Sequence, residues 1–534
     1  MDKMILSGNE ALARGAWEAG ATVGTGYPGT PSTEILENFT TYPDVYSEWS
    51  VNEKVALEVG IGASLSGART IVTMKHVGIN VAADPLFTAS YIGVRGGLVL
   101  ICADDPGMHS SQNEQDSRNY AFAAKIPMLE PSDSEEARAF IHRAFQLSEK
   151  YDTPVIVRST TRISHAKGII FPQQRRDEKI GPEKGFSRDI KKYVMIPAYA
   201  RKRHEVVETR MQKLKEDIES TDLNIVEQGD KKIGFITSGV AYTYVKELFP
   251  EASILKLGLV YPLPEKTIRD FCSGVDKVAV VEELDPFFEL RIRAMGIEIH
   301  GKDLFPLTGE FNTNIVKTGM EKIGYESSKS IEAPLTSSVA LPPRPPSLCP
   351  GCPHRTVYKV LREKDVVITG DIGCYTLGAL PPYESMDTVV DMGASVTVSQ
   401  GIEIVEGTES KKPAVSIVGD STFAHSGLTG LLNAAYNQRK GLIIVLDNGT
   451  TAMTGMQPNP FSGERIDGNE TFVLDYEKLA AAMGIGAANF RMVDAYKADQ
   501  IETAIEDLIE KKELSLLVVK GLCIILKKRR ARNK

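Results

Sequence analysis

Nine short runs rich in Val, Ile and Leu constrain the fold of this chain more than any other feature of its sequence. They are TIVTM at 70, GLVLICAD at 97, PVIVRS at 154, KIGFITSG at 232, KVAVVEE at 277, VVITGD at 366, AVSIVGD at 414, GLIIVLDN at 441 and LSLLVVKG at 514. Strands that are apolar on both faces are typical of parallel sheets covered by helices. Because helix-length segments separate the runs, the pattern predicts α/β domains.

The length and composition of the chain limit its class. At 534 residues it suggests about three domains, taking roughly 100 to 200 residues for each. A hydrophobic content of 42%, a charged content of 25% and a net charge of -8 are those of an ordinary globular protein, and they do not indicate a nucleic-acid partner. The first residues lack the apolar stretch of a signal peptide, and no run of about 20 apolar residues could span a bilayer. We therefore expect a cytoplasmic protein with no membrane partner.

Two segments of unusual composition divide the chain. Residues 171–228 are polar and dense in charge, which favours a solvated helical linker, with a partner surface as the alternative. Residues 331–347, IEAPLTSSVALPPRPPS, are rich in proline and predict a stiffened linker. These segments leave three candidate domains, at 1–170, 229–330 and 348–534.

The last domain carries a pair of polar strand ends. The run AVSIVGD ends at Asp420, and GLIIVLDN ends at Asn448, 28 residues later. The ends of neighbouring parallel strands can bring a carboxylate and an amide oxygen together, and these are ligands that magnesium prefers. The helix that follows Gly419 and Ser421 can direct free N–H groups at a diphosphate. The alternative is that both motifs are ordinary strand-end turns.

The first domain offers a candidate acidic residue. Glu53 begins a predicted helix in SVNEKVALEVGIGASLSGA, and we expect Gly62 and Ala63 to allow close packing of that helix. A glutamate at a helix start is often only a favourable placement on the helix dipole, and Glu58 is an equally ordinary neighbour. The residues alone do not decide between a structural and a catalytic role for Glu53.

Several motifs together resemble the large (alpha) subunits of the thiamine diphosphate-dependent 2-oxoacid:ferredoxin oxidoreductase family, and its indolepyruvate branch in particular. They are GYPGTPS, VTMKHVGINVAADPL, CPGCPHR, GDIGCYTLG, VGDSTFAHSG and DNGTTAMTG. The resemblance implies an α/β chain of three doubly wound domains. In it, a pyrimidine-binding domain at 1–170 and a diphosphate-binding domain at 348–534 flank a transketolase C-terminal-like domain at 229–330.

The resemblance also implies roles for individual residues. The motif GD, followed after 25 to 30 residues by N and here by TTAMTG, is similar to the family's thiamine diphosphate motif. By that resemblance, magnesium is bound by the side chains of Asp420 and Asn448 and by the backbone carbonyl of Thr450. Glu53 then activates the cofactor through its aminopyrimidine ring, and Thr30 faces the substrate. Two histidines are candidates for substrate or adduct contacts, although each could equally be structural: His76 and His425.

Four of the six cysteines form a further candidate site. Cys349 and Cys352 in LCPGCPHR fit a redox dithiol, half of a zinc knuckle or half of an iron-sulfur site. Cys374 and Cys523 bring the number of thiols to four, which suits a 4Fe-4S cluster and equally a zinc ion. The family resemblance implies the 4Fe-4S cluster, and it leaves as ordinary buried thiols Cys102 and Cys272.

The activity implied by the resemblance is oxidative decarboxylation of aryl 2-oxo acids, such as indolepyruvate, to acyl-CoA, with coenzyme A as cosubstrate. Ferredoxin or a similar acceptor would take the electrons, and a small (beta) subunit would join two copies of this chain. The family's large subunit usually continues into a ferredoxin-like domain with two CxxCxxCxxxCP runs, whereas this sequence stops eleven residues after Cys523. Two alternatives stay open: a non-redox decarboxylase with structural zinc, and a non-catalytic scaffold subunit.

Overall fold

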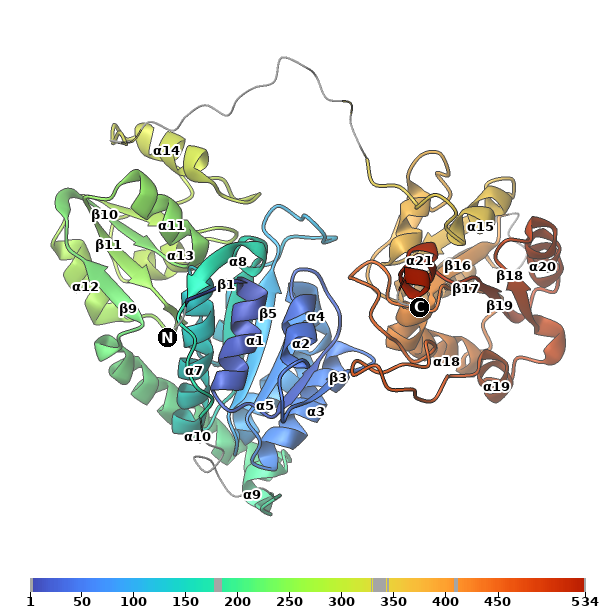
Figure 1. Cartoon of the computed structure of the whole chain (residues 1–534), viewed down its shortest axis with the longest axis horizontal. Coiled ribbons are helices and arrows are strands. Elements are labelled where there is room, and N and C mark those ends of the chain that lie inside the picture. Colours follow the sequence, from blue (N-terminus) through green and yellow to red (C-terminus); the bar gives the residue numbers. More distant parts are fainter. Residues whose placement is uncertain are drawn as a thin grey trace. The chain divides into compact units, whose positions relative to one another are not determined.

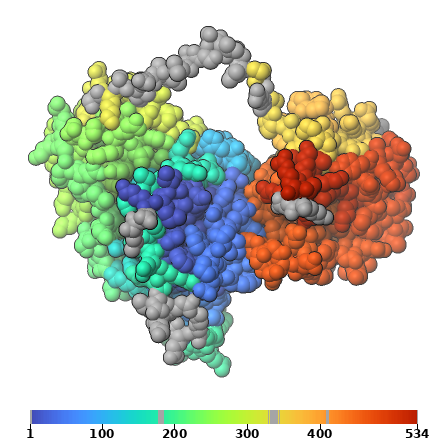
Figure 2. All heavy atoms as spheres, viewed as in Figure 1, coloured from blue at the N-terminus to red at the C-terminus, as the bar shows by residue number. Residues whose placement is uncertain are grey.

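The computed structural model describes residues 3–176, 185–327, 329, 342, 345–407 and 412–532. It divides into two compact units, Met1–Thr336 and Ser337–Lys534. Figure 1 shows the first unit in blue to yellow and the second in yellow to red, and Figure 2 shows the same view as spheres. Most of the predicted proline-rich linker, 331–347, lies outside the described residues.

The first unit is built on a seven-stranded sheet of order β12-β6-β7-β5-β4-β2-β3. The predicted runs at 70, 97 and 154 form its three central neighbours, whose residues are all buried: β4 (Thr70–Lys75), β5 (Leu98–Asp104) and β7 (Val155–Thr160). These strands are parallel, as predicted. The other strands are β2 (Val23–Gly26), β3 (Tyr46–Trp49), β6 (Met128–Leu129) and β12 (Leu259–Tyr261).

Helix α3 (Glu53–Leu65) packs against β2 and β4. It begins where predicted, because the side chain of Asn52 caps it by accepting a hydrogen bond of 3.0 Å from the Val55 N–H. The close approach to the sheet occurs at Gly60, where a Cβ would lie 2.6 Å from a methyl carbon of Val72. The expectation for Gly62 was wrong, since nothing lies within 4 Å of a Cβ there. Gly62 comes two residues after Gly60, so it lies on the other side of the helix and points away from the sheet.

The first unit also contains a four-stranded sheet of order β13-β10-β11-β9. The runs at 232 and 277 form the parallel neighbours β10 (Asp230–Thr237) and β13 (Val278–Val281). Beside them lie β11 (Ala252–Leu257) and, at the edge, the antiparallel strand β9 (Asn224–Glu227), which comes from the predicted linker. The same segment contains α10 (Pro197–Asp217), which packs on α5 (Ala83–Ile92). The predicted domain boundaries stay predictions.

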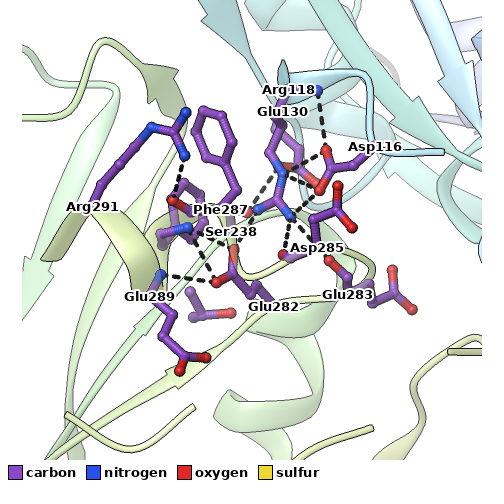
Figure 3. Close-up of polar contacts among 12 residues, drawn as sticks. Asp116, Arg118, Glu130, Ser238, Glu282, Glu283, Asp285, Phe287, Glu289 and Arg291 are labelled. Carbon is purple, nitrogen blue, oxygen red and sulfur yellow. Dashed lines mark hydrogen bonds and ion pairs between the residues drawn. The ribbon is translucent and has the colours of Figure 1, made fainter. Parts of the chain in front are cut away.

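A buried ionic network joins the seven-stranded and the four-stranded sheet of the first unit (Figure 3). Arg118 donates to a carboxylate oxygen of Asp116 at 2.9 Å and, across the junction, to Glu282 at 2.7 Å. Its guanidinium also donates to the backbone carbonyls of Glu283 and Asp285, at 3.0 and 3.1 Å. Removing one partner of a buried ion pair costs about 3 to 5 kcal/mol, because the other charge is left unpaired. The network therefore fixes the two sheets to each other.

The second unit contains a six-stranded parallel sheet of order β15-β14-β16-β17-β19-β18. The last four predicted runs form four adjacent strands: β14 (Val367–Gly370), β16 (Ala414–Gly419), β17 (Gly441–Asp447) and β19 (Leu514–Lys520). The edges are β15 (Thr388–Val389) and β18 (Phe490–Asp494).

Both faces of this sheet are buried. Ile417 of β16 packs in a core with α15 (His354–Leu361) and α20 (Ala498–Glu510). Its neighbour Val418 packs in a separate core that includes residues of α16 (Ala394–Glu406), α18 (Leu428–Tyr436) and α19 (Tyr476–Ala482). Helices on both faces of a parallel sheet make a doubly wound layer, so the predicted α/β class is confirmed.

None of the helices in the described part of the chain is long and apolar enough to cross a membrane.

Candidate active site

The predicted magnesium ligands meet at one edge of the six-stranded sheet. β16 and β17 are parallel neighbours, so their carboxyl ends lie side by side. Asp420, directly after β16, accepts hydrogen bonds from the backbone N–H groups of Gly449 at 2.9 Å and Thr450 at 3.2 Å. The side-chain oxygen of Asn448 accepts from the same Thr450 N–H at 3.1 Å. Two of the predicted oxygen ligands therefore converge on one point.

The electrostatics of this edge suit a cation. Asp420 is buried, and the pKa of its carboxyl is raised to about 8, first by burial and then by the nearby Asp447 carboxylate. The ammonium of Lys520 lies 3.5 Å from the carboxylate of Asp447, but more than half of the lysine side chain is exposed. Buried carboxylates of like charge are unfavourable unless a cation neutralises them. The donor set therefore fits a hard divalent ion such as magnesium.

The predicted diphosphate residues precede a buried helical segment. A Cβ on Gly419 would lie 2.5 Å from the ring of Tyr375, so this position has no room for a side chain. The N–H of Ser421 donates to Asp420 at 2.8 Å, and its hydroxyl accepts from Thr451 at 2.8 Å. The chain then forms a short π-helical turn (Phe423–Gly427), which holds the buried His425. Such turns are frequent at functional sites.

The four predicted cysteine ligands lie around the same edge. Cys349 and Cys352 form a turn that the Cys352 N–H closes at 3.0 Å, and Gly351 allows it with a φ of 78°. Cys374 begins a 3-10 turn (Cys374–Ala379), and Cys523 follows β19. The pKa of Cys374 is raised to about 12, first by burial, then by the other three thiols and by Asp420. The four thiols are therefore electrostatic neighbours of one another.

Asn448 connects the predicted magnesium site with the cysteines. Its amide N–H donates to Nε2 of His354 at 3.2 Å, and its carbonyl accepts from the Cys523 N–H at 2.9 Å. His354 follows directly after CPGCP and is 3% exposed. Burial lowers its pKa to about 4, so the imidazole is neutral and Nε2 can accept. The side chain and the backbone carbonyl of Asn448 thus tie the segments of His354 and Cys523 to the strand end of β17.

In the first unit, Glu53 lies at the carboxyl edge of the seven-stranded sheet. It is 5% exposed and packs against Gly78, where a Cβ would lie 2.7 Å from Cγ and Oε1 of Glu53. The glycine of VTMKHVGINV therefore makes room for this carboxylate. Thr30 lies in the loop after β2, and its carbonyl accepts from the Ser110 hydroxyl at 3.1 Å.

His76 is fully buried at the end of β4. Its Nε2 lies 3.2 Å from the Asn113 carbonyl, so Nε2 carries the proton and Nδ1 is left as an acceptor. Nδ1 has no hydrogen-bond partner among the described residues. Burial lowers the pKa of the ring, which keeps it neutral. His76 can accept a hydrogen bond from a ligand, and it is a poor cation.

Comparisons with known proteins place the chain in a family. Two family models match: "Pyruvate flavodoxin/ferredoxin oxidoreductase, thiamine diP-bdg" over residues 14–228, and "Thiamine pyrophosphate enzyme, C-terminal TPP binding domain" over residues 371–519. The indolepyruvate oxidoreductase subunit IorA of Archaeoglobus fulgidus is 42% identical over 563 residues, covering 100% of this chain and 88% of the relative. The protein of the same name from Pyrococcus horikoshii is 40% identical, with 98% and 86% covered. The chain belongs to the family of indolepyruvate oxidoreductase A subunits.

Family membership makes the chain an oxidoreductase with two thiamine diphosphate-binding domains, of the class that oxidises 2-oxo acids. A solved structure supports the fold. It is "2-oxoglutarate:ferredoxin oxidoreductase from Magnetococcus marinus with 2-oxoglutarate, coenzyme A and succinyl-CoA bound", with a TM-score of 0.50 and 18% identity over 60% of this chain and 65% of that one.

The sequence alone did not point to three further polar residues of the candidate sites: His354, Lys75 and Asp371. His354 stands in the quoted motif CPHR, and Lys75 ends the strand run TIVTMK. Asp371 begins the turn GDIGC, and accepts from the Ser395 hydroxyl at 2.7 Å and the Gly393 N–H at 3.1 Å. Asp371 thereby ties the Cys374 turn to the start of α16. A polar residue at the end of a buried strand, or directly after it, is a signal that could have found Lys75 and Asp371.

Proposed function

We propose that this chain oxidises aryl 2-oxo acids, such as indolepyruvate, to acyl-CoA with thiamine diphosphate and magnesium. Electrons would leave through a 4Fe-4S cluster to ferredoxin or a similar acceptor. The name of the curated relatives supports the aryl substrate. Coenzyme A and the acceptor rest on the family resemblance.

The observation that carries the proposal is the pair of bonds made by Asn448. A predicted magnesium ligand donates to His354 beside Cys352, and its backbone accepts from Cys523. A cofactor bound at Asp420 and Asn448 would therefore lie close to a redox centre held by the cysteines. That proximity is what electron transfer out of the cofactor requires.

The family resemblance favours a cluster over zinc at the four thiols. A tetrahedral zinc site, with Zn–S bonds of about 2.3 Å, needs its sulfurs roughly 4 Å apart. Within the described ranges, no three His, Cys, Asp or Glu side chains are grouped to hold a single metal ion. The pKa values of Cys352 and Cys374 are nevertheless raised, first by burial and then by neighbouring thiols of the set. Four neighbouring thiols are the number of ligands that a 4Fe-4S cluster takes.

Each residue set has a role in this proposal. Asp420, Asn448 and the Thr450 carbonyl would hold magnesium, and Gly419 and Ser421 would line the diphosphate. Glu53 would hydrogen-bond the aminopyrimidine ring, with Thr30, His76 and His425 as contacts for the substrate. When bound, thiamine diphosphate would supply the means to cleave the bond to the carboxylate, and the cluster would accept electrons singly.

The proposal includes a partner. The curated relatives are named as subunits, which supports a partner subunit, and the family resemblance implies a small (beta) subunit joined to two copies of this chain.

Metal analysis tests the proposal. Anaerobically purified protein should contain about four irons and four sulfides per chain. Replacing Cys349, Cys352, Cys374 or Cys523 with alanine should diminish or convert the cluster. Cys102→Ala and Cys272→Ala are matched controls in the first unit and should leave it intact. One zinc and no sulfide per chain would contradict the redox function.

A further inference from the structure

Lys75 is a buried lysine at the edge where parallel sheets bind ligands. It is the last residue of β4 and is 8% exposed. Its stem packs against Gly29 of GYPGTPS, where a Cβ would lie 3.2 Å from Cγ of Lys75. Its ammonium donates to the Ser110 carbonyl at 2.9 Å, and the Ser110 hydroxyl donates to the Thr30 carbonyl at 3.1 Å. The charge therefore lies beside the loop of Thr30.

The hydrogen bonds of Lys75 leave room for a ligand. An ammonium has three donors, and within the described part of the chain Lys75 makes the one bond to Ser110. Asp105 lies nearby, but its carboxylate already accepts from the Ser110 N–H at 2.8 Å and from the hydroxyls of Ser111 and Thr161, each at 2.6 Å. These bonds hold Asp105 ionised and lower its pKa, burial acting in the opposite direction.

The charge balance at Lys75 is incomplete. Burial lowers its pKa to about 8, and the carboxylates of Asp105 and Glu53 act in the opposite direction without restoring the usual value. The adjacent His76, which also faces the buried Asp104, is neutral. A further anion beside the ammonium would stabilise its charged form.

We propose that Lys75 is the subsite that binds the carboxylate of the substrate acid. The inference rests on the proposed function and deepens it, because an aryl 2-oxo acid carries one carboxylate that needs a cation in a dry site. Lys75 lies near Glu53, the residue assigned to the cofactor, and near Thr30, the residue assigned to the substrate. His76 is unsuited to this role, since its unpartnered Nδ1 is an acceptor and would repel a carboxylate.

The subsite has a pH signature. A bound carboxylate raises the pKa of Lys75, so binding above pH 8 takes up a proton. Affinity for the acid should therefore be constant below about pH 8 and fall as the pH rises through that value. An uncharged analogue should show no such dependence.

The test uses indole-3-propionate and its amide, which lack the keto group and do not react. Calorimetry on the protein loaded with thiamine diphosphate and magnesium should show that the wild type prefers the acid. Lys75→Met keeps the apolar stem of the side chain. It should weaken binding of the acid by about 10- to 100-fold and leave binding of the amide unchanged, since hydrogen bonds to charged groups contribute about 1.5 to 3 kcal/mol. Lys75→Arg should recover part of the preference. Lys256→Met, at an equally buried lysine paired with Glu136, should leave both affinities unchanged.

A second readout avoids the variants. Acetylation of Lys75 by acetic anhydride, followed by mass spectrometry, should be suppressed by indole-3-propionate and not by the amide. If thiamine diphosphate still binds, either of two results would overturn the subsite. One is that indole-3-propionate does not protect Lys75 from acetylation, and the other is that the Lys75→Met protein still prefers the acid. A wild-type protein that binds no thiamine diphosphate would contradict the proposed function, and the subsite with it.

Discussion

Replacing His354 with leucine should damage both the stability of the second unit and its cofactor site. The substitution removes the acceptor of the Asn448 amide N–H, which lies 3.2 Å away. Both side chains are buried, so no water replaces the lost bond. The Asn448 amide, a predicted magnesium ligand, then keeps the hydrogen bond from the Thr450 N–H but loses the contact that holds its N–H side.

The size of the effect follows from two contacts. A buried donor left without an acceptor costs about 1 to 3 kcal/mol. The imidazole also packs edge to face on Tyr375, with ring centroids 6.3 Å apart, and losing such a contact adds about 1 kcal/mol. The free energy of unfolding should therefore fall by roughly 2 to 4 kcal/mol. Affinity for thiamine diphosphate with magnesium should fall about tenfold, or roughly 1.4 kcal/mol.

Urea denaturation and calorimetry measure the two effects. His354→Gln restores an acceptor oxygen and should recover at least half of each loss. His142→Leu is the matched control: burial also lowers the pKa of His142 to about 4, and its Nε2 has no hydrogen-bond partner in the described part of the chain. The control should leave cofactor affinity unchanged. A His354→Leu protein as stable as the wild type, with unchanged affinity, would refute the assigned role of this bond.

Three further substitutions test other parts of the account. Glu53→Gln should keep thiamine diphosphate bound yet lower turnover by about two to four powers of ten, and near-normal turnover would remove Glu53 from its role. Asp420→Ala should weaken cofactor binding, with poor rescue by excess magnesium, whereas unchanged calorimetry would contradict the magnesium site. Burial raises the pKa of Glu283 from 4.5 to about 7, so the folded protein holds this proton more tightly than the unfolded chain. Wild-type stability should fall relative to Glu283→Gln as the pH rises from 4.5 to 7, by up to about 3 kcal/mol, and parallel pH profiles would show that Glu283 is not the cause.

The nine strands expected from the sequence were predictable because each comes from a near-continuous apolar run, a pattern written locally in the sequence. The ends of β16 and β17 were predictable for the same reason, since a polar residue directly after such a run stands out. The contact of Gly60 with Val72 was not predictable, because the face that α3 turns toward β4 depends on the angle at which the helix crosses the sheet. Strand β9 was assigned to a linker because a short antiparallel edge strand has little apolar signal.

Residues that act through distant partners were also beyond the sequence. His354 matters because β17 ends beside the CPGCP turn, a neighbour relation that no local pattern states. Lys75 matters because residues from three separate segments surround it: Gly29, Glu53, and the pair Asp105 and Ser110. The spacing of motifs along a chain does not report which strand ends become neighbours in the folded protein.

The most direct test of the central claim is the electronic spectrum of anaerobic protein before and after addition of indolepyruvate. If a 4Fe-4S cluster accepts electrons from the decarboxylated substrate, the brown absorption should bleach. Glu53→Gln should slow the bleaching without loss of iron. An iron-containing protein whose spectrum indolepyruvate leaves unchanged, or a colourless protein that contains zinc, would contradict the account.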